Sequence, residues 1–323
     1  MISVVITTYN GEKYIEAQLR SVFMQSKPVD EVLIFDDGSA DKTIGIVNRF
    51  ISENGCNGWS LIQNKENKGY CKNFLEGVKT AKGDIIFLAD QDDVWNLEKV
   101  AEMTAVLESR AEIKALCCSC DLINGNDEPI VDPGNIGMLF SKNDGSVETF
   151  SPEKFIGRSF IRGCSVGFKS EILQFVEPIE LKGLLSHDWL ITFTAALRGK
   201  CAVLNKVLMS YRCHGENTSF GERKWGAEAL QKRIDALKYS VEGYSFILNN
   251  ADKYPADIKI KKKLQKQIDF ENTRIEYLKS GKVSAFLKCV FSILKYSCYY
   301  GSVVKGFKVF IGDILYRKRS KIS

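Results

Sequence analysis

The 323-residue sequence predicts an α/β fold with a mostly parallel sheet, and two observations support that prediction. First, short apolar runs rich in β-branched residues alternate with segments of helical apolar spacing through the first 113 residues, which is typical of strand–helix–strand units. Second, the expected strands are apolar almost throughout, as they are in parallel sheets that helices cover on both faces.

Strands and helices are expected in a regular order in this first part. The strand 2–7 is followed by the helix 14–25, whose apolar residues Ile15, Leu19, Val22 and Phe23 have helical spacing. The further expected strands are 31–39, 59–64 and 84–90, and the further expected helices are 41–54, 70–82 and 97–109.

The alternation ends near residue 114. The remaining expected elements are a strand at 113–124, a Gly/Asn/Asp-rich loop at 124–147, a strand turning into a helix at 163–173, a helix at 187–199, two short strands within 201–215, and two long polar helices at about 222–250 and 256–280. A basic, aromatic tail follows these helices. The sequence therefore predicts a helical part after the sheet.

The net charge of +5 is divided unevenly along the chain. From Lys282 onward there are nine basic residues and one acid, Asp313, so this tail carries +8, whereas the preceding 281 residues carry −3. This asymmetry predicts an anionic surface as the partner of the tail, and it argues against a body that binds nucleic acid.

The ten cysteines have no framework spacing, and "MISVVITTYN" lacks the basic start and long apolar run of a signal peptide. Both observations favour reduced thiols in the cytosol. The C-x-x-C within Cys117–Cys120 has no second pair to complete a zinc ribbon, so we interpret it as part of a core strand.

Three acids, Asp90, Asp92 and Asp93, directly follow the expected strand 84–90. Ligands of open parallel sheets bind beyond the carboxyl ends of the strands, yet neither G-x-G-x-x-G after the first strand nor G-x-x-x-x-G-K-[ST] occurs. We therefore expect a divalent cation, Mn²⁺ or Mg²⁺, to relieve the repulsion between these carboxylates and to bind phosphates. The spacing alone is equally compatible with a solubilising loop or a helix cap.

Four motifs in order resemble the family 2 glycosyltransferases of GT-A fold: "SVVITTYNGEKYIEAQLRSVFMQ", "EVLIFDDGSADKT", Asn67–Gly69 and "GDIIFLADQDDVW". The resemblance covers about residues 1–220. It implies a Rossmann-like GT-A catalytic domain there, with a nucleotide-sugar-binding half at 1–113 and an acceptor and catalytic-base half at 114–220. A helical extension with a basic amphipathic tail is expected at 221–323.

The resemblance also implies roles for single residues in the first half. Asp92 is expected to bind the metal directly, and Asp90 is expected to meet the ribose or a metal-bound water. The residues expected to bind the donor nucleotide are Thr8, Tyr9, Asp36, Asp37 and Asp90.

In the second half, the family's general base matches Asp188 in "LLSHDWL", with His187 as a competitor because its ordinary pKa of ~6.5 suits the same task. A helix cap is the structural alternative for this segment. "YRCHGENTS" resembles a family segment in which His214 would complete the metal shell and Arg212 would pair with the diphosphate. Weaker candidates for diphosphate or acceptor contacts are Asn217 and Trp189.

The tail is interrupted by lysines too often for a membrane-spanning helix. A set of its apolar residues shares one helical face, as in helices that lie in the headgroup region: Phe286, Leu287, Val290, Phe291 and Leu294. We expect peripheral docking to an anionic membrane surface at the cytoplasmic side of the inner membrane. Packing of the tail on the catalytic domain is the alternative.

The resemblance implies an inverting, metal-dependent transfer of a single sugar from a UDP- or dTDP-sugar, such as dTDP-rhamnose, to a lipid-linked oligosaccharide in O-antigen or capsule synthesis. A sugar-nucleotide nucleotidyltransferase is the alternative enzyme, although "TTYNGEKY" supplies only Gly11 and Lys13 toward the phosphate loop such an enzyme needs. The other alternative is a non-catalytic sugar-nucleotide-binding subunit.

Overall fold

The computed structural model describes residues 1–131, 142–157, 159–176, 185–215, 226–295 and 303–319. The chain divides into two compact units. The first comprises Met1–Phe150, Phe160–Pro178 and His187–Gly221, and the second comprises Ser151–Ser159, Ile179–Ser186 and Glu222–Ser323.

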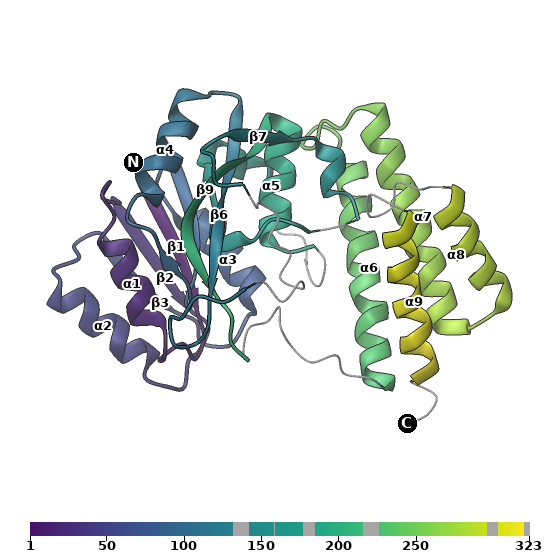
Figure 1. Cartoon of the computed structure of the whole chain (residues 1–323), viewed down its shortest axis with the longest axis horizontal. Helices are drawn as coiled ribbons and strands as arrows, with labels where there is room; N and C mark the ends of the chain where they lie inside the picture. The colour runs from purple at the N-terminus through teal and green to yellow at the C-terminus, as the bar shows by residue number, and fades with distance from the viewer. Residues whose placement is uncertain (132–141, 158, 177–184, 216–225, 296–302, 320–323) are drawn as a thin grey trace. The chain divides into compact units, whose positions relative to one another are not determined.

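The first half of the first unit is a parallel sheet with helical connections, as the sequence predicts (Figure 1). Its strands are paired in the order β3-β2-β1-β4. Their bounds are β1 Ile2–Thr8, β2 Glu31–Asp36, β3 Trp59–Gln63 and β4 Ile85–Asp90, and those of the helices are α1 Ile15–Phe23, α2 Thr43–Glu53 and α3 Tyr70–Thr80. All residues of β1 and β2 are buried, which accounts for the largely apolar character of these strands.

The sheet continues with strands of mixed direction, and the described strands together form one nine-stranded sheet. Strand β8 is antiparallel to both β4 and β6, β9 is parallel to β6, and both β5 and β7 are antiparallel to β9. The bounds are β5 Val94–Trp95, β6 Ile113–Ile123, β7 Val147–Phe150, β8 Val166–Lys169 and β9 Lys200–Arg212, with helices α4 Lys99–Ser109 and α5 His187–Arg198.

Two expectations for this part are wrong. The two short strands expected within 201–215 are one strand, β9, which bulges where Asn205 and Lys206 have no partners in β6. A bulge bends a strand without ending it, so the polar pair is tolerated inside β9. The helix expected after β8 is a 3₁₀ helix, Ser170–Phe175, and the acid-rich loop after β4 contains the short strand β5.

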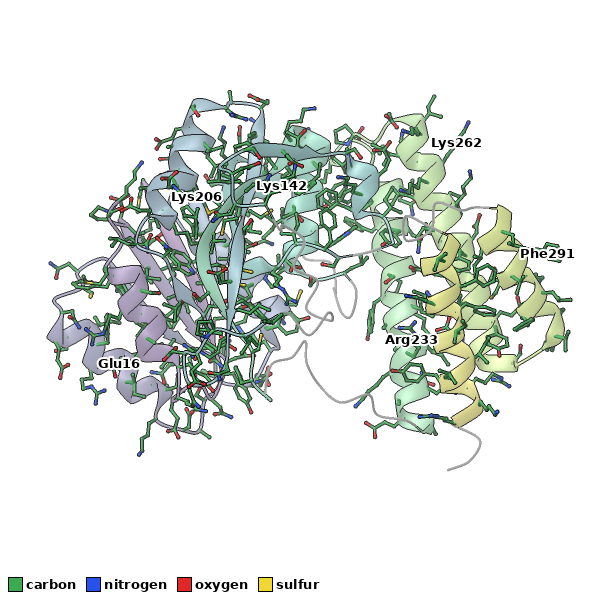
Figure 2. The ribbon with its side chains drawn as sticks, in the orientation of Figure 1. Glu16, Lys142, Lys206, Arg233, Lys262 and Phe291 are labelled. Atoms are coloured by element: carbon green, nitrogen blue, oxygen red, sulfur yellow. The ribbon has the colours of Figure 1, made fainter. Side chains whose placement is uncertain are left out.

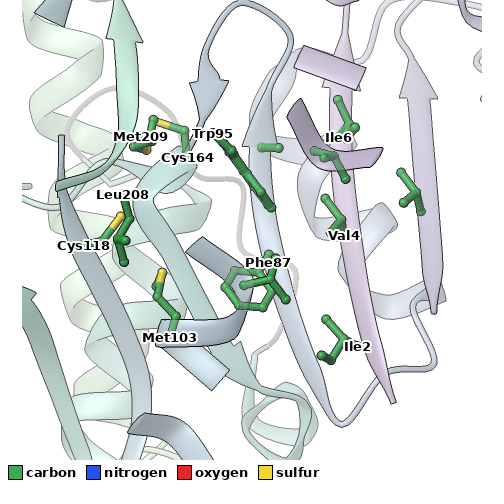
Figure 3. Close-up of a cluster of buried hydrophobic side chains, with 14 of the residues drawn as sticks. Ile2, Val4, Ile6, Phe87, Trp95, Met103, Cys118, Cys164, Leu208 and Met209 are labelled. Carbon is green, nitrogen blue, oxygen red and sulfur yellow. The ribbon is translucent and has the colours of Figure 1, made fainter. Parts of the chain in front are cut away.

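A buried cluster fills the space beside the sheet (Figure 3). Phe87 of β4 packs on Trp95, with ring centroids 5.8 Å apart, and lies against Gly167, where an added Cβ would be 2.7 Å from the ring. Cys117, Cys118 and Cys120 are buried in β6. The C-x-x-C segment is therefore a core strand, as predicted.

Parallel pairing places the ends of three strands at one edge. Thr8 at the end of β1 pairs with Asp36 at the end of β2, and the neighbouring Thr7 pairs with Asp90 at the end of β4. The acids that the sequence places after separate strands therefore reach the same edge of the sheet.

The second unit contains four long helices, packed against one another (Figure 1). Their bounds are α6 Ala227–Asn249, α7 Ile258–Ser280, α8 Val283–Lys295 and α9 Val303–Arg319, so both predicted polar helices are present. Asp257 caps α7 by accepting a hydrogen bond from the Ile260 backbone N–H at 2.7 Å. Gly281 ends α7 in the left-handed region, with φ 62°. Within the described residues, no helix is long and apolar enough to span a bilayer.

Buried charges fasten α9 to its neighbours. Asp313 of α9 accepts two hydrogen bonds from Arg274 of α7, at 2.6 and 3.0 Å, and one from Arg233 of α6 at 3.0 Å. The side chains of Asp313 and Arg274 are both 0% exposed. Breaking such a pair on one side leaves an uncompensated buried charge, so the pairing determines where α9 packs.

Glu271 is a second buried acid in this unit, and it gives a testable pH dependence. Burial raises its pKa from 4.5 to about 7, despite a hydrogen bond from Gln267 and the charge of Arg274. As the pH rises from 4.5 toward 7, the unfolded chain releases this proton before the folded one does, so stability falls across that window.

We expect Glu271→Gln to remove this loss. The variant should match the parent near pH 4.5 and exceed it by about 3 kcal/mol at pH 8, measured by urea unfolding followed by circular dichroism. Glu228→Gln on α6, where the side chain is 82% exposed, is the control and should track the parent. Parallel pH profiles for parent and Glu271→Gln would contradict the assignment.

Candidate functional site

Gln91, which follows β4, joins the loop after β1 to the acid-rich loop. Its Oε1 accepts hydrogen bonds from the Thr8 hydroxyl at 2.7 Å and the Tyr9 backbone N–H at 2.9 Å, and its Nε2 donates to the Tyr9 carbonyl at 3.1 Å. Gly11 lies so close that any Cβ there would collide with the Gln91 amide. Thr8 is buried and the Tyr9 ring is 48% exposed, so of these two only Tyr9 offers a surface to a ligand.

Asp37 organises the Asn67–Gly69 loop. Its carboxylate accepts hydrogen bonds from the Asn64 side chain at 2.9 Å, the Lys68 backbone N–H at 2.9 Å and the Gly69 backbone N–H at 2.8 Å. Gly69 has φ 81°, which favours glycine. A carboxylate has about four acceptor positions, of which these contacts occupy three, and Asp37 is 3% exposed.

The hydrogen bonds of Asp36 differ from the expected contact with the donor nucleotide. Its carboxylate is 0% exposed and accepts hydrogen bonds from the backbone N–H groups of Gly38 and Ser39, at 3.1 and 2.8 Å, and from the Ser39 hydroxyl. This arrangement shapes the loop after β2. We therefore assign Asp36 to holding the loop in place of direct contact with a nucleotide.

The carboxylates after β4 are packed closely enough to disturb one another. Burial, followed by the charges of Asp92 and Asp188, raises the pKa of Asp90 to about 7. Burial, followed by the charges of Asp92 and Asp90, raises the pKa of Asp93 well above its usual value. One oxygen of Asp93 accepts the Arg212 backbone N–H at 3.1 Å. The cluster thus shows the repulsion between neighbouring carboxylates that the sequence suggested.

His214 follows β9, far from the cluster in the sequence, and its side chain contacts the cluster. Its Nε2 lies 2.8 Å from Oδ2 of Asp92, and the two side chains are 12% and 14% exposed. The His214 ring lies on the Tyr14 ring, with centroids 4.8 Å apart. The structure therefore brings together the two residues that the sequence proposed as metal ligands.

The Arg212 side chain is buried next to Asp92, and Arg212 is 1% exposed. Its guanidinium donates to the Asp92 carbonyl at 2.7 Å and the Asn124 carbonyl at 3.1 Å, pairs with Asp127 at 2.6 Å, and lies 4.6 Å from the centre of the Tyr14 ring. These contacts occupy all three of its nitrogen atoms. The expected contact with a diphosphate does not fit this position, and we assign Arg212 to positioning Asp92 and His214.

Two sets of side chains fit a cation on different grounds. Asp90, Asp93 and Cys164 bring three potential ligand atoms within 4.8 Å of one another, but Asp93 and Cys164 are fully buried. Asp92 and His214 are partly exposed and supply one carboxylate and one imidazole, a donor set that suits Mn²⁺ better than Mg²⁺. We therefore regard Asp92 and His214 as the residues that would hold the metal, with Asp90 facing it.

Asp188 and His187 begin α5 but lie in different surroundings. His187 is 4% exposed, its ring is stacked on Phe74 with centroids 4.2 Å apart, and neither ring nitrogen has a hydrogen-bond partner among the described residues. Burial lowers its pKa, against the opposing charge of Asp188. His187 is thus a neutral, enclosed imidazole, and its burial keeps it from the exposed position in which a general base reaches an acceptor hydroxyl.

Asp188 lies near Asp90 and Tyr70. Burial raises the pKa of Tyr70 to about 12, and the charges of Cys71, Asp188 and Asp90 add to the effect. The charge of Asp188 also contributes to the raised pKa of Asp90. Asp188 is therefore close enough for its charge to influence Asp90 and Tyr70.

Of the remaining weak candidates, Trp189 does not join the site. Trp189 is 1% exposed and packs on Phe193 at 4.9 Å between ring centroids, so it belongs to the core and is not placed to stack on a sugar. Asn217 lies outside the described residues.

The sequence reasoning missed several residues of the site: Tyr14, Gln91, Arg162, Cys164 and Tyr70. Arg162, whose charge lowers the pKa of Asp90, lies 4.4 Å from the centre of the Tyr211 ring. Gln91 lies inside the acid motif, so its polarity between two carboxylates was a usable signal. Nothing in the local pattern around Arg162 or Cys164 distinguishes them from ordinary loop and core residues.

The sheet, with its crossover helices and its acids at the carboxyl edge, defines a nucleotide-diphospho-sugar transferase of GT-A fold. A model of glycosyl transferase family 2 matches residues 3–174, more than half of the chain. The chain belongs to that family.

Characterised and uncharacterised relatives carry similar names. An uncharacterized glycosyltransferase of Nostoc sp. is 27% identical over 217 residues, 67% of this chain and 66% of that protein. Escherichia coli WfgD, a UDP-Glc:α-D-GlcNAc-diphosphoundecaprenol β-1,3-glucosyltransferase, is 22% identical over 75% of this chain and 87% of its own length. The dTDP-rhamnosyl transferase RfbG of Shigella flexneri is 27% identical over 72% and 84%. The match thus spans just under two thirds of the Nostoc protein.

Solved structures show the same fold. Staphylococcus aureus TarS 1–349, in complex with UDP-GlcNAc, has a TM-score of 0.58 at 17% identity, covering 99% of this chain and 90% of that one. The mannosyltransferase PcManGT of Pyrobaculum calidifontis, in complex with GDP-Man and Mn²⁺, has a TM-score of 0.55 at 18% identity, covering 99% and 83%.

The position of Arg212 gives a prediction for metal binding. Replacing it in Arg212→Lys keeps the charge but removes the fork that fixes the Asp92 backbone and the Tyr14 ring. We expect the affinity for Mn²⁺ to fall by about 10- to 100-fold, measured by the electron paramagnetic resonance signal of free Mn²⁺.

Arg20→Lys is the matched control, since Arg20 also lies over a ring, that of Phe50, but is 62% exposed. It should bind Mn²⁺ like the parent. A folded Arg212→Lys protein whose Kd for Mn²⁺ equals that of the parent would show that Arg212 does not position the ligands.

Proposed function

We propose that this chain transfers a single sugar, with inversion, from a nucleotide-diphosphate sugar to an acceptor hydroxyl. The observation that supports it is the meeting of Asp92 and His214 at 2.8 Å, beside Asp90 and near Asp188, at the carboxyl edge of the sheet. These residues come from both halves of the first unit, and together they offer a metal site, a donor site and a base.

The donor nucleotide would lie along the ends of β1 and β2. Tyr9 offers an exposed ring to the base, and Asp37 retains an acceptor position for an imide N–H, which uracil and thymine have. Thr8 and Asp36 would support these two residues through the hydrogen bonds that they already make. A UDP- or dTDP-sugar donor, with dTDP-rhamnose as one candidate, follows from this arrangement and agrees with the names of WfgD and RfbG.

The diphosphate would meet the metal held by Asp92 and His214. When bound there, Mn²⁺ or Mg²⁺ would offset the charge that develops on the departing nucleoside diphosphate. Asp90 faces the same region and would contact the ribose or a metal-bound water. Arg212 would hold Asp92 and His214 in place from behind.

Asp188 would act as the general base. Its carboxylate would take the proton of the acceptor hydroxyl as that oxygen attacks the anomeric carbon, from the side opposite the diphosphate. A single displacement of this kind inverts the configuration and needs no second carboxylate as nucleophile. His187 would remain neutral under Phe74 and support the start of α5.

The acceptor would be a lipid-linked glycan of bacterial surface-polysaccharide synthesis, such as O-antigen or capsule. WfgD, by its name, acts on a sugar linked to diphosphoundecaprenol. An acceptor of this kind lies at a membrane, so the protein would work in the cytoplasm, peripherally at the inner face of the cytoplasmic membrane.

Asp188→Asn tests the proposed base. We expect turnover to fall by about 10²- to 10⁴-fold while donor binding is retained, because the amide cannot accept the proton. His187→Asn is the comparison and should keep the larger part of the activity. Release of nucleoside diphosphate identifies a sugar transfer, release of pyrophosphate would identify a nucleotidyltransferase, and no release from either parent or variant would identify a binding subunit.

Thermal unfolding with different sugar nucleotides tests the donor site. With a ligand at 100 times its Kd, the folded state gains about 2.7 kcal/mol, so a UDP- or dTDP-sugar with Mn²⁺ should raise Tm by several degrees. GDP-mannose should raise it less, because the two-ring guanine is larger than the pyrimidine that we place beside Tyr9 and Asp37. An Asp92→Ala protein with the full Mn²⁺-dependent shift would contradict the metal assignment.

A further inference from the structure

Helix α8 exposes a row of apolar side chains that no described residue covers. Val283, Leu287, Phe291 and Leu294 are 72%, 47%, 66% and 57% exposed, and their spacing places them on one face of the helix. Phe291 points away from the ribbon (Figure 2). These four side chains are here called the α8 stripe.

The opposite face of α8 accounts for how the helix packs. Ala285, Cys289 and Ile293 are buried in a cluster with residues of α7 and α9, and Phe286 and Val290 are partly buried against it. The sequence grouped Phe286 and Val290 with the outward face, and that grouping is wrong. Because the other face of α8 already packs in this cluster, the α8 stripe is not needed to hold α8 in the unit.

Positive charge surrounds the α8 stripe. Lys282 and Lys288 flank it on exposed positions, and Lys308 of α9 lies between the exposed Val304 and Ile311 in that helix. The one acid after residue 282, Asp313, is 0% exposed and bound to two arginines. Lys288 lies 3.4 Å from the exposed Glu276 of α7, but the sequence from Lys282 onward contains no acid other than Asp313.

Apolar side chains among lysines fit the boundary of an anionic bilayer better than a second copy of the chain. Two copies joined through the α8 stripe would bring their lysines together, which is unfavourable. A row of four side chains is also small against the roughly 1,200–2,000 Å² that stable protein interfaces bury. In a bilayer, the apolar row would enter the acyl boundary while the lysines meet anionic headgroups.

We propose that the α8 stripe, with Lys282, Lys288 and Lys308, is a docking surface for an anionic lipid bilayer, with α8 lying in the plane of the interface. No described helix is long and apolar enough to cross a bilayer. The surface does not depend on the proposed transfer reaction, and it can be tested without it.

Co-sedimentation of the full chain with vesicles tests this proposal. The parent should sediment with phosphatidylglycerol-containing vesicles, remain largely in the supernatant with pure phosphatidylcholine, and be released by 0.5 M NaCl. The double variant Leu287→Ser/Phe291→Ser should bind the anionic vesicles at least roughly tenfold more weakly.

Met24→Ser/Leu97→Ser is the matched control, because those side chains are also apolar and exposed, at 58% and 52%, but belong to the first unit. It should bind vesicles within twofold of the parent. A circular dichroism spectrum and a urea unfolding transition equal to those of the parent would show that the stripe variant is folded.

Two results would overturn the proposal. One is a parent that ignores anionic vesicles, or a folded stripe variant that binds them like the parent. The other is a parent that is dimeric by light scattering and becomes monomeric in the stripe variant without any vesicle binding, because the α8 stripe would then be a self-association surface. As a further readout in a folded protein, Phe291→Trp should show a blue-shifted fluorescence difference on adding anionic vesicles.

Discussion

The parallel pairing of β1, β2 and β4 is the constraint on which the candidate site depends. Neighbouring strands that run in the same direction end at the same edge of the sheet, so the loops that follow them lie close together. In this chain β2 and β4 end in the carboxylates Asp36 and Asp90, and the pairing of Thr8 with Asp36 and of Thr7 with Asp90 fixes how close they come. The fold holds these carboxylates close together, so their charges repel one another, and a bound cation would reduce that repulsion.

Much of the first unit could be predicted from local patterns. The strand and helix positions followed from apolar periodicity, since fully buried parallel strands have an unmistakable composition. The convergence of the acids followed from topology. His214 and Asp92 could be paired only through the family resemblance, because 122 residues separate them and nothing local relates a loop after β9 to a loop after β4.

The errors concern polar residues that have more than one possible partner. Asp36 and Asp37 are neighbours of the same type, yet one is closed into its own loop and the other holds a different loop. Arg212 could equally have faced a phosphate or the interior. Such choices depend on which acceptors the folded chain places within reach, and amphipathic spacing in α8 likewise marks two possible inner faces without selecting one. The sequence predicts which groups are available, and tertiary packing decides between them.

The bulge in β9 has a consequence for the evolution and engineering of this chain. Side chains alternate between the two faces of a strand, and the pairing of β9 with β6 is irregular twice in this stretch, where Asn205 and Lys206 have no partners and again before Ser210. A one-residue deletion or insertion there would rotate Arg212 out of the interior and carry His214 away from Asp92. A change in the length of β9 is therefore expected to disturb the site, even though the bulge itself lies at a distance along the strand from the proposed ligands.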